Sequence, residues 1–179
     1  EGDNFIDGGA GNDTLSGRGY LAGGVGDDTL NGYGILDGGA GKDRLNAYSG
    51  AVILFGEGSG NDVIENAANP QGFVVRTDLR PSDVEIVGGK LDGLDLPLTL
   101  RIVATGESLT GINGAASIVF ADGNAWSAAD IAAHARIPAP MATEGNDTLL
   151  GGAGDDTLAA DEGDDRLAGG AGTDILNGA

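Results

Sequence analysis

The chain has 179 residues and a formal net charge of −19, with 9 basic against 28 acidic residues, 35 glycines, 5 prolines and no cysteine. So little proline excludes a collagen triple helix, and the lack of cysteine excludes disulfides and thiolate metal sites. The negative charge opposes binding to phosphate backbones and anionic lipid. No apolar run approaches the roughly 20 residues of a membrane helix. We therefore expect neither nucleic-acid binding nor membrane insertion.

Glycine and acidic residues are concentrated in two parts of the chain. Residues 1–66 hold 18 glycines and residues 143–179 hold 9, whereas residues 67–142 hold only 8. Acidic stretches of this kind are often disordered, but here both are periodic. We divide the chain into a first repeat block (1–66), a connecting or capping segment (67–142) and a second repeat block (143–179). We expect the second block to be truncated, because it ends where another copy would begin.

One nine-residue pattern, Gly-Gly-x-Gly-x-Asp-x-apolar-x, recurs in both blocks. Strict copies begin at Gly8, Gly23 and Gly38, and a looser copy begins at Glu57. Copies in the second block run end to end over 142–150, 151–159, 160–168 and 169–177. The glycines permit sharp turns, and the aspartate supplies a hard anionic oxygen that suits Ca²⁺.

The eighth position of the pattern is apolar in every copy. The three residues after the aspartate would form a short strand whose middle side chain faces the core. The position is occupied by Ile6, Leu15, Leu21, Leu30, Leu36, Leu45, Leu54, Ile64, Leu149, Leu158, Leu167 and Leu176. Such a column predicts a stacked parallel β-roll, in which each turn buries its apolar residue against the next.

The pattern resembles the calcium-binding nonapeptide of the RTX (repeats-in-toxin) haemolysin-type family. The resemblance covers both blocks and implies an all-β fold, a parallel β-roll or calcium-loaded β-solenoid. It also implies a module of a larger secreted bacterial protein, which leaves the cell by type I secretion and folds on binding calcium outside. Residues 118–126 resemble the strand-helix segment that follows many RTX rolls.

The resemblance also implies which residues bind the ions. In the family, one turn gives carbonyl groups from its second and fourth positions and the next turn from its first and third, each with its sixth-position aspartate. The first block would hold three ions with Gly9, Gly11, Asp13, Gly23, Val25 and Asp28; with Gly24, Gly26, Asp28, Gly38, Ala40 and Asp43; and with Gly39, Gly41, Asp43, Glu57, Ser59 and Asp62. The second block would hold two, with Thr143, Gly145, Asp147, Ala160, Glu162 and Asp165, and with Gly152, Gly154, Asp156, Gly169, Ala171 and Asp174. Several of these positions depart from the family's glycines, which makes their sites less regular.

The two edges of the first block differ in sequence. The strict copies start 15 residues apart, and the pieces between them, 17–22 and 32–37, lack the sixth-position aspartate. The next piece, 47–55, would place Val52 there. We therefore expect three ions on one edge of the roll and none on the other. The seventh-position residues of the second edge are apolar and would form an outward column: Phe5, Tyr20, Ile35 and Ile53. Either the connecting segment or a neighbouring domain covers this column, or it binds a receptor.

The connecting segment is expected to be β-rich with one short helix. Strands are predicted over 73–77, 84–87, 98–103 and 117–120 from β-branched content and flanking turns. Ser127 and Asp130 have the spacing of a capping box, which predicts a helix over 128–135.

No catalytic constellation accompanies the repeats. His134 is the single histidine, and no nucleophile, phosphate loop or zinc signature lies with it, so we expect no enzyme activity. Two further functions stay open beside the calcium module. One is an adhesive module that binds carbohydrate, ice or a cell receptor, and the other is the non-catalytic tail of a secreted hydrolase or epimerase.

Overall fold

The computed structural model describes residues 4–65, 72–91, 94–136, 146, 148–153, 156–160 and 162–178. They belong to two compact units, one formed by Glu1–Ile86 with Pro97–His134 and the other by Val87–Leu96 with Ala135–Ala179. The described part of the chain is mostly β-strand and contains one α-helix, which confirms the all-β prediction. None of its helices is long and apolar enough to cross a membrane.

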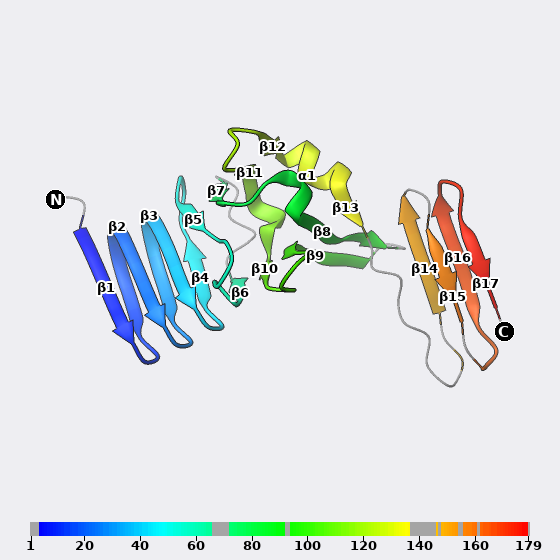
Figure 1. Ribbon diagram of the computed structural model, residues 1–179, viewed down its shortest axis with the longest axis horizontal. Helices are drawn as coiled ribbons and strands as arrows, with labels where there is room; N and C mark the ends of the chain where they lie inside the picture. The colour runs from blue at the N-terminus through cyan, green and yellow to red at the C-terminus, as the bar shows by residue number, and fades with distance from the viewer. Residues whose placement is uncertain are drawn as a thin grey trace. The chain divides into compact units, whose positions relative to one another are not determined.

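The first unit begins with a parallel β-roll, whose first strands lie side by side in Figure 1. Its strands are β1 (Asn4–Ala10), β2 (Thr14–Val25), β3 (Thr29–Ala40), β4 (Arg44–Ala47), β5 (Val52–Leu54), β6 (Asn61–Ile64) and β7 (Phe73–Arg76). β2 and β3 pair in parallel, so that Leu15 faces Leu30 and Leu21 faces Leu36. Residues 15 positions apart, which is one full turn of the roll, are therefore stacked neighbours, as the β-roll prediction requires.

An apolar column fills the interior of this roll. Leu21, Leu30, Leu36 and Leu45 have exposed fractions of 0%, and Leu15 is 5% exposed. Burying one such side chain stabilises the fold by about 1.5–3 kcal/mol. Because each leucine contacts its equivalents one turn away, the column holds the turns in register.

One predicted register, that of β5, is wrong. Ile53 was expected to face outward, but it is 0% exposed and pairs with Leu36 of the core column. Val52 instead pairs with Ile35 and continues the outward column. Leu54, expected in the core, is only half-buried. The corrected column is Phe5, Tyr20, Ile35, Val52 and Val74.

The turn before β5 causes this shift. The Ala51 N–H donates a hydrogen bond of 2.9 Å to the Tyr48 carbonyl oxygen, and Gly50 has a φ of 75°. This tight turn brings β5 into register one residue earlier than the nine-residue spacing predicts. A shift of one residue in a strand moves every side chain to the opposite face. Ile53 therefore enters the core.

β2 and β3 cross the second edge of the roll without leaving the strand conformation. The short pieces 17–22 and 32–37 lie within these two strands. Gly19 and Gly34 provide the bend with φ values of 105° and 118°. A Cβ added to Gly34 would overlap the Gly19 carbonyl oxygen. Glycine is needed here both for the backbone conformation and for the close approach of two turns.

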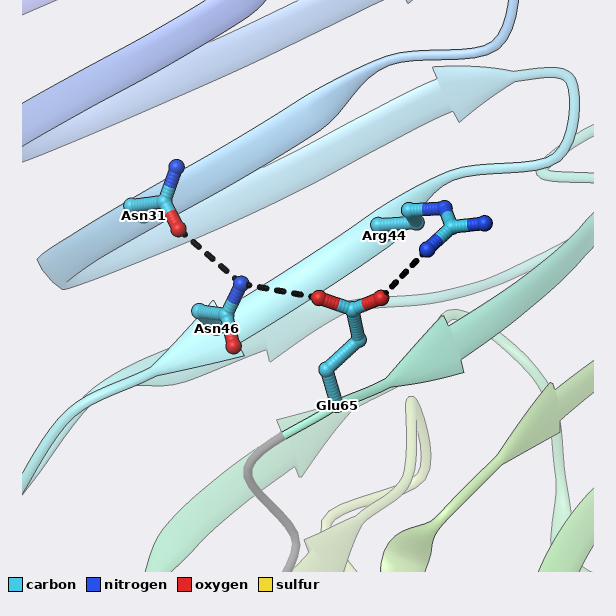
Figure 2. A network of polar contacts seen from close by, with 4 residues as sticks. All are labelled: Asn31, Arg44, Asn46 and Glu65. Carbon is cyan, nitrogen blue, oxygen red and sulfur yellow. Dashed lines mark hydrogen bonds and ion pairs between the residues drawn. The ribbon is translucent and has the colours of Figure 1, made fainter.

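Polar side chains connect the outer faces of neighbouring turns, as Figure 2 shows. Asn46 Nδ2 donates hydrogen bonds to Asn31 Oδ1 at 2.9 Å and to Glu65 Oε2 at 3.4 Å. Arg44 forms an ion pair of 2.7 Å with Glu65 Oε1, and these two side chains are 66% and 38% exposed. An ion pair this exposed contributes no more than about 1 kcal/mol to stability.

The connecting segment adds strands to the roll and contains the helix. Its elements are β8 (Val84–Leu91), β9 (Leu94–Ile102), β10 (Ser108–Thr110), β11 (Ala115–Val119), β12 (Ala125–Ser127), α1 (Ala128–His134), β13 (Ala135–Arg136) and 3-10 helices at Pro81–Asp83 and Ile112–Gly114. β10 pairs in parallel with β6, and β11 pairs in parallel with β7. These two strands therefore continue the stacking of the roll.

α1 is the short helix that the capping box predicts. Asp130 Oδ2 accepts hydrogen bonds from the Ser127 N–H at 2.8 Å and from its hydroxyl at 2.7 Å, and the Asp130 N–H donates to Ser127 Oγ at 3.3 Å. At the other end, the exposed His134 ring stacks on Trp126 with a centroid distance of 4.1 Å. Both ends of the helix are thus stabilised by residues close to it in the sequence.

The second unit contains two parallel strand pairs with uninterrupted nine-residue spacing. β14 (Thr148–Ala153) pairs with β16 (Arg166–Ala171), and β15 (Thr157–Ala159) pairs with β17 (Ile175–Asn177). Leu149 and Leu158 are 1% and 0% exposed. The same apolar column thus forms a small core in this block.

Candidate metal centre

Four aspartates form a column along one edge of the first block. Each backbone N–H donates to Oδ1 of the aspartate one turn later: Asp13 to Asp28 at 2.7 Å, Asp28 to Asp43 at 2.8 Å, and Asp43 to Asp62 at 3.0 Å. Asp28, Asp43 and Asp62 are only 1%, 1% and 2% exposed. The structure thus brings the sixth-position aspartates of four copies together, at the point where each loop enters its strand.

The second oxygen of three of these carboxylates has no partner. Oδ2 of Asp13, Asp28 and Asp43 is buried and makes no hydrogen bond. A buried charge left without compensation costs several kcal/mol. Carboxylate oxygens of this kind are the ligands that a hard cation such as Ca²⁺ prefers. The column therefore fits the calcium role that the sequence implies.

The first glycine of the repeat makes room for this free oxygen. A Cβ added to Gly8 would lie 2.9 Å from Asp13 Oδ2, and one added to Gly23 would overlap Asp28 Oδ2. The second glycine has a different reason, since Gly9 and Gly24 have φ values of 89° and 110°. The double glycine thus combines a spatial requirement with a conformational one.

The carbonyl groups that are predicted to bind calcium stack one turn apart. Gly9 faces Gly24, and Val25 faces Ala40. The Val25 carbonyl oxygen accepts the Gly11 N–H at 2.8 Å, which leaves it one lone pair. The other predicted donors of the strict copies lie in the same strands or in the loops between them: Gly23, Gly26, Gly38, Gly39 and Gly41. Their role as ligands stays a prediction.

The looser copy stacks on the third strict copy. Gly60 and Gly41 form an isolated parallel bridge, and the Asn61 N–H donates to the Gly41 carbonyl oxygen at 3.0 Å. The predicted donors Glu57 and Ser59 lie in the loop that precedes β6. The last predicted site of the first block is therefore built on a turn that keeps its place despite the missing first glycine.

Burial changes the acidity at this end of the column. Burial raises the pKa of Asp62 to about 8, and the charge of Asp43 adds to the effect. Burial also raises the pKa of Asp43, with contributions from the charges of Asp28 and Asp27. These carboxyl groups bind protons at a pH at which exposed carboxyls are ionised.

The second block contains the same arrangement. The Asp156 N–H donates to Asp174 Oδ1 at 3.0 Å, and Asp156 Oδ2 is buried without a partner. A Cβ added to Gly169 would overlap Asp174 Oδ2. Gly152 faces Gly170, and Ala171 faces Ala153. The structure thus pairs the two aspartates that the nine-residue spacing pairs.

The other predicted set of this block is only partly described. Thr143, Gly145 and Asp147 lie outside the described residues, as does Gly154 of the first set. Ala160 is buried, Glu162 is exposed and Asp165 is half-buried. The ligand roles of this set stay a prediction.

Side chains alone do not complete a site. Within the described ranges, no three acidic or histidine side chains converge closely enough to hold a metal ion. The unpaired carboxylate oxygens instead follow one another along the roll, one from each turn. The remaining ligands of an ion between two turns would be backbone carbonyl groups, as the resemblance implies.

A second ladder of polar side chains runs beside the aspartates and was missed from the sequence. Asn12 Oδ1 accepts the Asp27 N–H at 3.0 Å, and Asp27 Oδ1 accepts the Lys42 N–H at 3.0 Å. Asn146 and Asp164 repeat the contact at 3.1 Å in the second block. The signal was the frequent Asn or Asp at the fifth position. This ladder connects the turns through neutral as well as charged side chains.

The second edge of the first block is held by aromatic contacts. Phe5 stacks on Tyr20 with a centroid distance of 5.4 Å, and Tyr33 lies 4.8 Å from Tyr48. The Tyr20 hydroxyl donates a hydrogen bond of 2.6 Å to Asp37 Oδ2, which is the main reason that the pKa of Tyr20 rises to about 12. Each ring thus turns a face toward another ring.

Comparison with known proteins agrees with this geometry. The model of the RTX calcium-binding nonapeptide repeat matches residues 1–19, 37–66 and 141–176 in four copies. No curated protein matched the chain. Repeats of this class bind calcium and are non-catalytic. The matched residues include Asp13, Asp43 and Asp62 of the first block and Asp156 and Asp174 of the second, but not Asp28. Over these residues, the chain carries four copies of the RTX calcium-binding nonapeptide repeat.

Proposed function

We propose that this chain is a calcium-dependent folding module of a larger, secreted bacterial RTX protein. The observation that carries the proposal is the column of buried carboxylate oxygens without partners at Asp13, Asp28 and Asp43. The family resemblance supports export through a type I secretion channel as an unfolded chain, with folding on reaching extracellular calcium. The module would then act outside the cell.

The aspartate column explains why folding would depend on the ion. Asp28 and Asp43 are almost fully buried on neighbouring turns, so their charges repel one another at low effective dielectric. Bound calcium would supply positive charge and coordinate the free oxygens. The large apolar side chains of each turn are few, and they offset the ordering entropy only partly. The binding free energy therefore becomes folding free energy.

The number of ions is part of the proposal. Three pairs of successive aspartates support three ions in the first block, and two pairs in the second block support two. The second edge of the first block would hold none, since β2 and β3 cross it as continuous strands. Counting the calcium bound per chain tests this asymmetry.

Far-UV circular dichroism during a calcium titration tests the folding mechanism, with magnesium as the control ion. We expect a coil-to-β transition that calcium produces and magnesium does not. Asp28→Asn should shift the midpoint to higher calcium, whereas Asp27→Asn, at the neighbouring exposed position, should leave it nearly unchanged. A spectrum that is already folded in chelator and does not respond to calcium would contradict the proposal.

A partner-binding role is the second candidate. Phe5, at the end of the outward column, is 70% exposed. We expect a carbohydrate or receptor to bind beside this ring if the module is adhesive. Binding of the calcium-loaded chain to a glycan array, and its loss in Phe5→Ser, would favour this role over a purely structural one.

A further inference from the structure

A carboxylate from outside the repeats holds the last repeat turn of the first block. Glu107 precedes β10 and accepts hydrogen bonds from the Gly58 N–H at 3.1 Å to each of its oxygens and from the Gly60 N–H at 3.3 Å. The Thr105 hydroxyl donates to Glu107 Oε2 at 2.8 Å. A single side chain thus binds two amides of the loop, which lie 49 and 47 positions away in the sequence.

In the earlier turns, a backbone carbonyl oxygen accepts the hydrogen bond from the fourth-position N–H. The Gly26 N–H, at the fourth position of its repeat, donates to the Ala40 carbonyl oxygen of the next turn at 2.9 Å. Gly60 has the same fourth position, but the strand that follows it in the roll is β10. β10 belongs to no repeat and brings no third-position carbonyl. Glu107 supplies the missing acceptor.

The two amides belong to peptide groups that carry predicted calcium ligands. The Gly58 N–H shares its peptide group with the Glu57 carbonyl, and the Gly60 N–H shares its own with the Ser59 carbonyl. A trans peptide directs its N–H and C=O in opposite directions, and the described residues contain no cis peptide. An anionic acceptor on the N–H therefore fixes the direction of the C=O and polarises it.

We propose that Glu107 is a positioning residue of the last calcium site in the first block, where it orients the Glu57 and Ser59 carbonyl groups. This inference rests on the proposed calcium-binding function. The Thr105 hydroxyl and the loop amides lower the pKa of Glu107, so its carboxylate is ionised at neutral pH. Groups that orient metal ligands typically change metal affinity by about 10–100-fold when they are removed.

Isothermal titration of the full chain with calcium tests the proposal. Glu107→Gln keeps the shape of the side chain and removes its charge. We expect one ion per chain to bind about tenfold or more weakly, while the other ions keep their affinity. Glu65→Gln is the matched control, because Glu65 lies at the end of β6 on the same turn and contacts Arg44 and Asn46 instead of the loop, as Figure 2 shows.

A second measurement separates positioning of the site from stabilisation of the fold. Thermal midpoints are compared in chelator and in saturating calcium, both with an osmolyte such as TMAO, which strengthens apolar burial and populates the folded state of the calcium-free chain. A positioning role predicts that Glu107→Gln reduces the calcium-dependent rise in the midpoint and leaves the midpoint in chelator nearly unchanged. Equal falls in both solutions, or unchanged affinity at every site, would overturn the proposal. A wild-type chain that binds no calcium would instead contradict the proposed function itself.

Discussion

Leu109 pairs with Asp62 across the last parallel ladder of the aspartate column, so that an apolar side chain stands where a further repeat would place its aspartate. The two side chains are 0% and 2% exposed. Asp62 therefore has a carboxylate neighbour, Asp43, on one side and an apolar one on the other. Asp62 is therefore the last carboxyl group of the column, and it is buried with no aspartate beside it on the following turn.

The stability of the calcium-free fold should depend on pH through this residue. Burial raises the pKa of Asp62 from 3.8 to about 8, so between these values the folded chain binds a proton that the unfolded chain does not. Stability should therefore fall as the pH rises from about 4 to about 8. Thermal unfolding in EDTA, with an osmolyte added to populate the folded state of the calcium-free chain, should give a higher midpoint at pH 5 than at pH 8.

A variant separates this effect from general charge repulsion, which has the same sign in a chain with a net charge of −19. Asp62→Asn resembles the protonated carboxyl and should reduce the difference between the two midpoints. Asp27→Asn removes one exposed charge and should leave most of the difference. Equal differences in the two variants would assign the pH dependence to net charge alone.

The corrected register of β5 predicts unequal effects at two adjacent positions. Ile53→Ala would leave a cavity in the core column and should destabilise the calcium-loaded chain by about 2–5 kcal/mol. Leu54→Ala should cost less, because its side chain is only half-buried. Urea unfolding in saturating calcium measures both, and a larger loss at Leu54 would restore the original register.

The contact between Gly23 and the Asp28 carboxylate predicts that even a methyl group is not tolerated there. Gly23→Ala places a Cβ where Asp28 Oδ2 and the Gly38 carbonyl oxygen lie. We expect overpacking to lower the free energy of unfolding by about 1–3 kcal/mol. We also expect calcium to bind more weakly. Gly178→Ala is the control, since a Cβ there meets nothing within 4 Å. Calcium titrations of both variants measure the difference.

The Arg44–Glu65 ion pair should matter little despite its short distance. Both side chains are substantially exposed, so Arg44→Ala should change the free energy of unfolding by less than about 1 kcal/mol. Any loss should shrink further in high salt. A loss of several kcal/mol that persists in high salt would show that the network in Figure 2 carries more of the stability than its exposure indicates.

The sequence predicts the parts of the fold that depend on local spacing. The recurrence of Asp13, Asp28 and Asp43 every 15 residues predicts both the aspartate column and the leucine column two residues further along. The capping box at Ser127 predicts where the helix begins. Each of these inferences needs only the repeat length and the alternation of side chains in a strand.

The remaining features depend on contacts that spacing does not encode. The β5 register follows from the Tyr48–Ala51 hydrogen bond, which replaces the loop that a nine-residue count assumes. Glu107 reaches the repeats only because β10 pairs with β6, far away in the sequence. The ladder through Asn12 and Asp27 was visible as a composition bias at the fifth position, but its partner is an amide one turn away.

When its carboxyl groups are ionised, the aspartate column also makes the roll a line of closely spaced charges. Stacked strands lie about 4.8 Å apart, so successive carboxylates stand closer than the roughly 7 Å at which two unit charges in water interact with thermal energy. A line of charge this dense accumulates counterions of any kind, as polyelectrolytes do. Sodium should therefore compete with calcium along the column. On the proposed function, the ionic strength of the surroundings should help to set the calcium concentration at which the module folds.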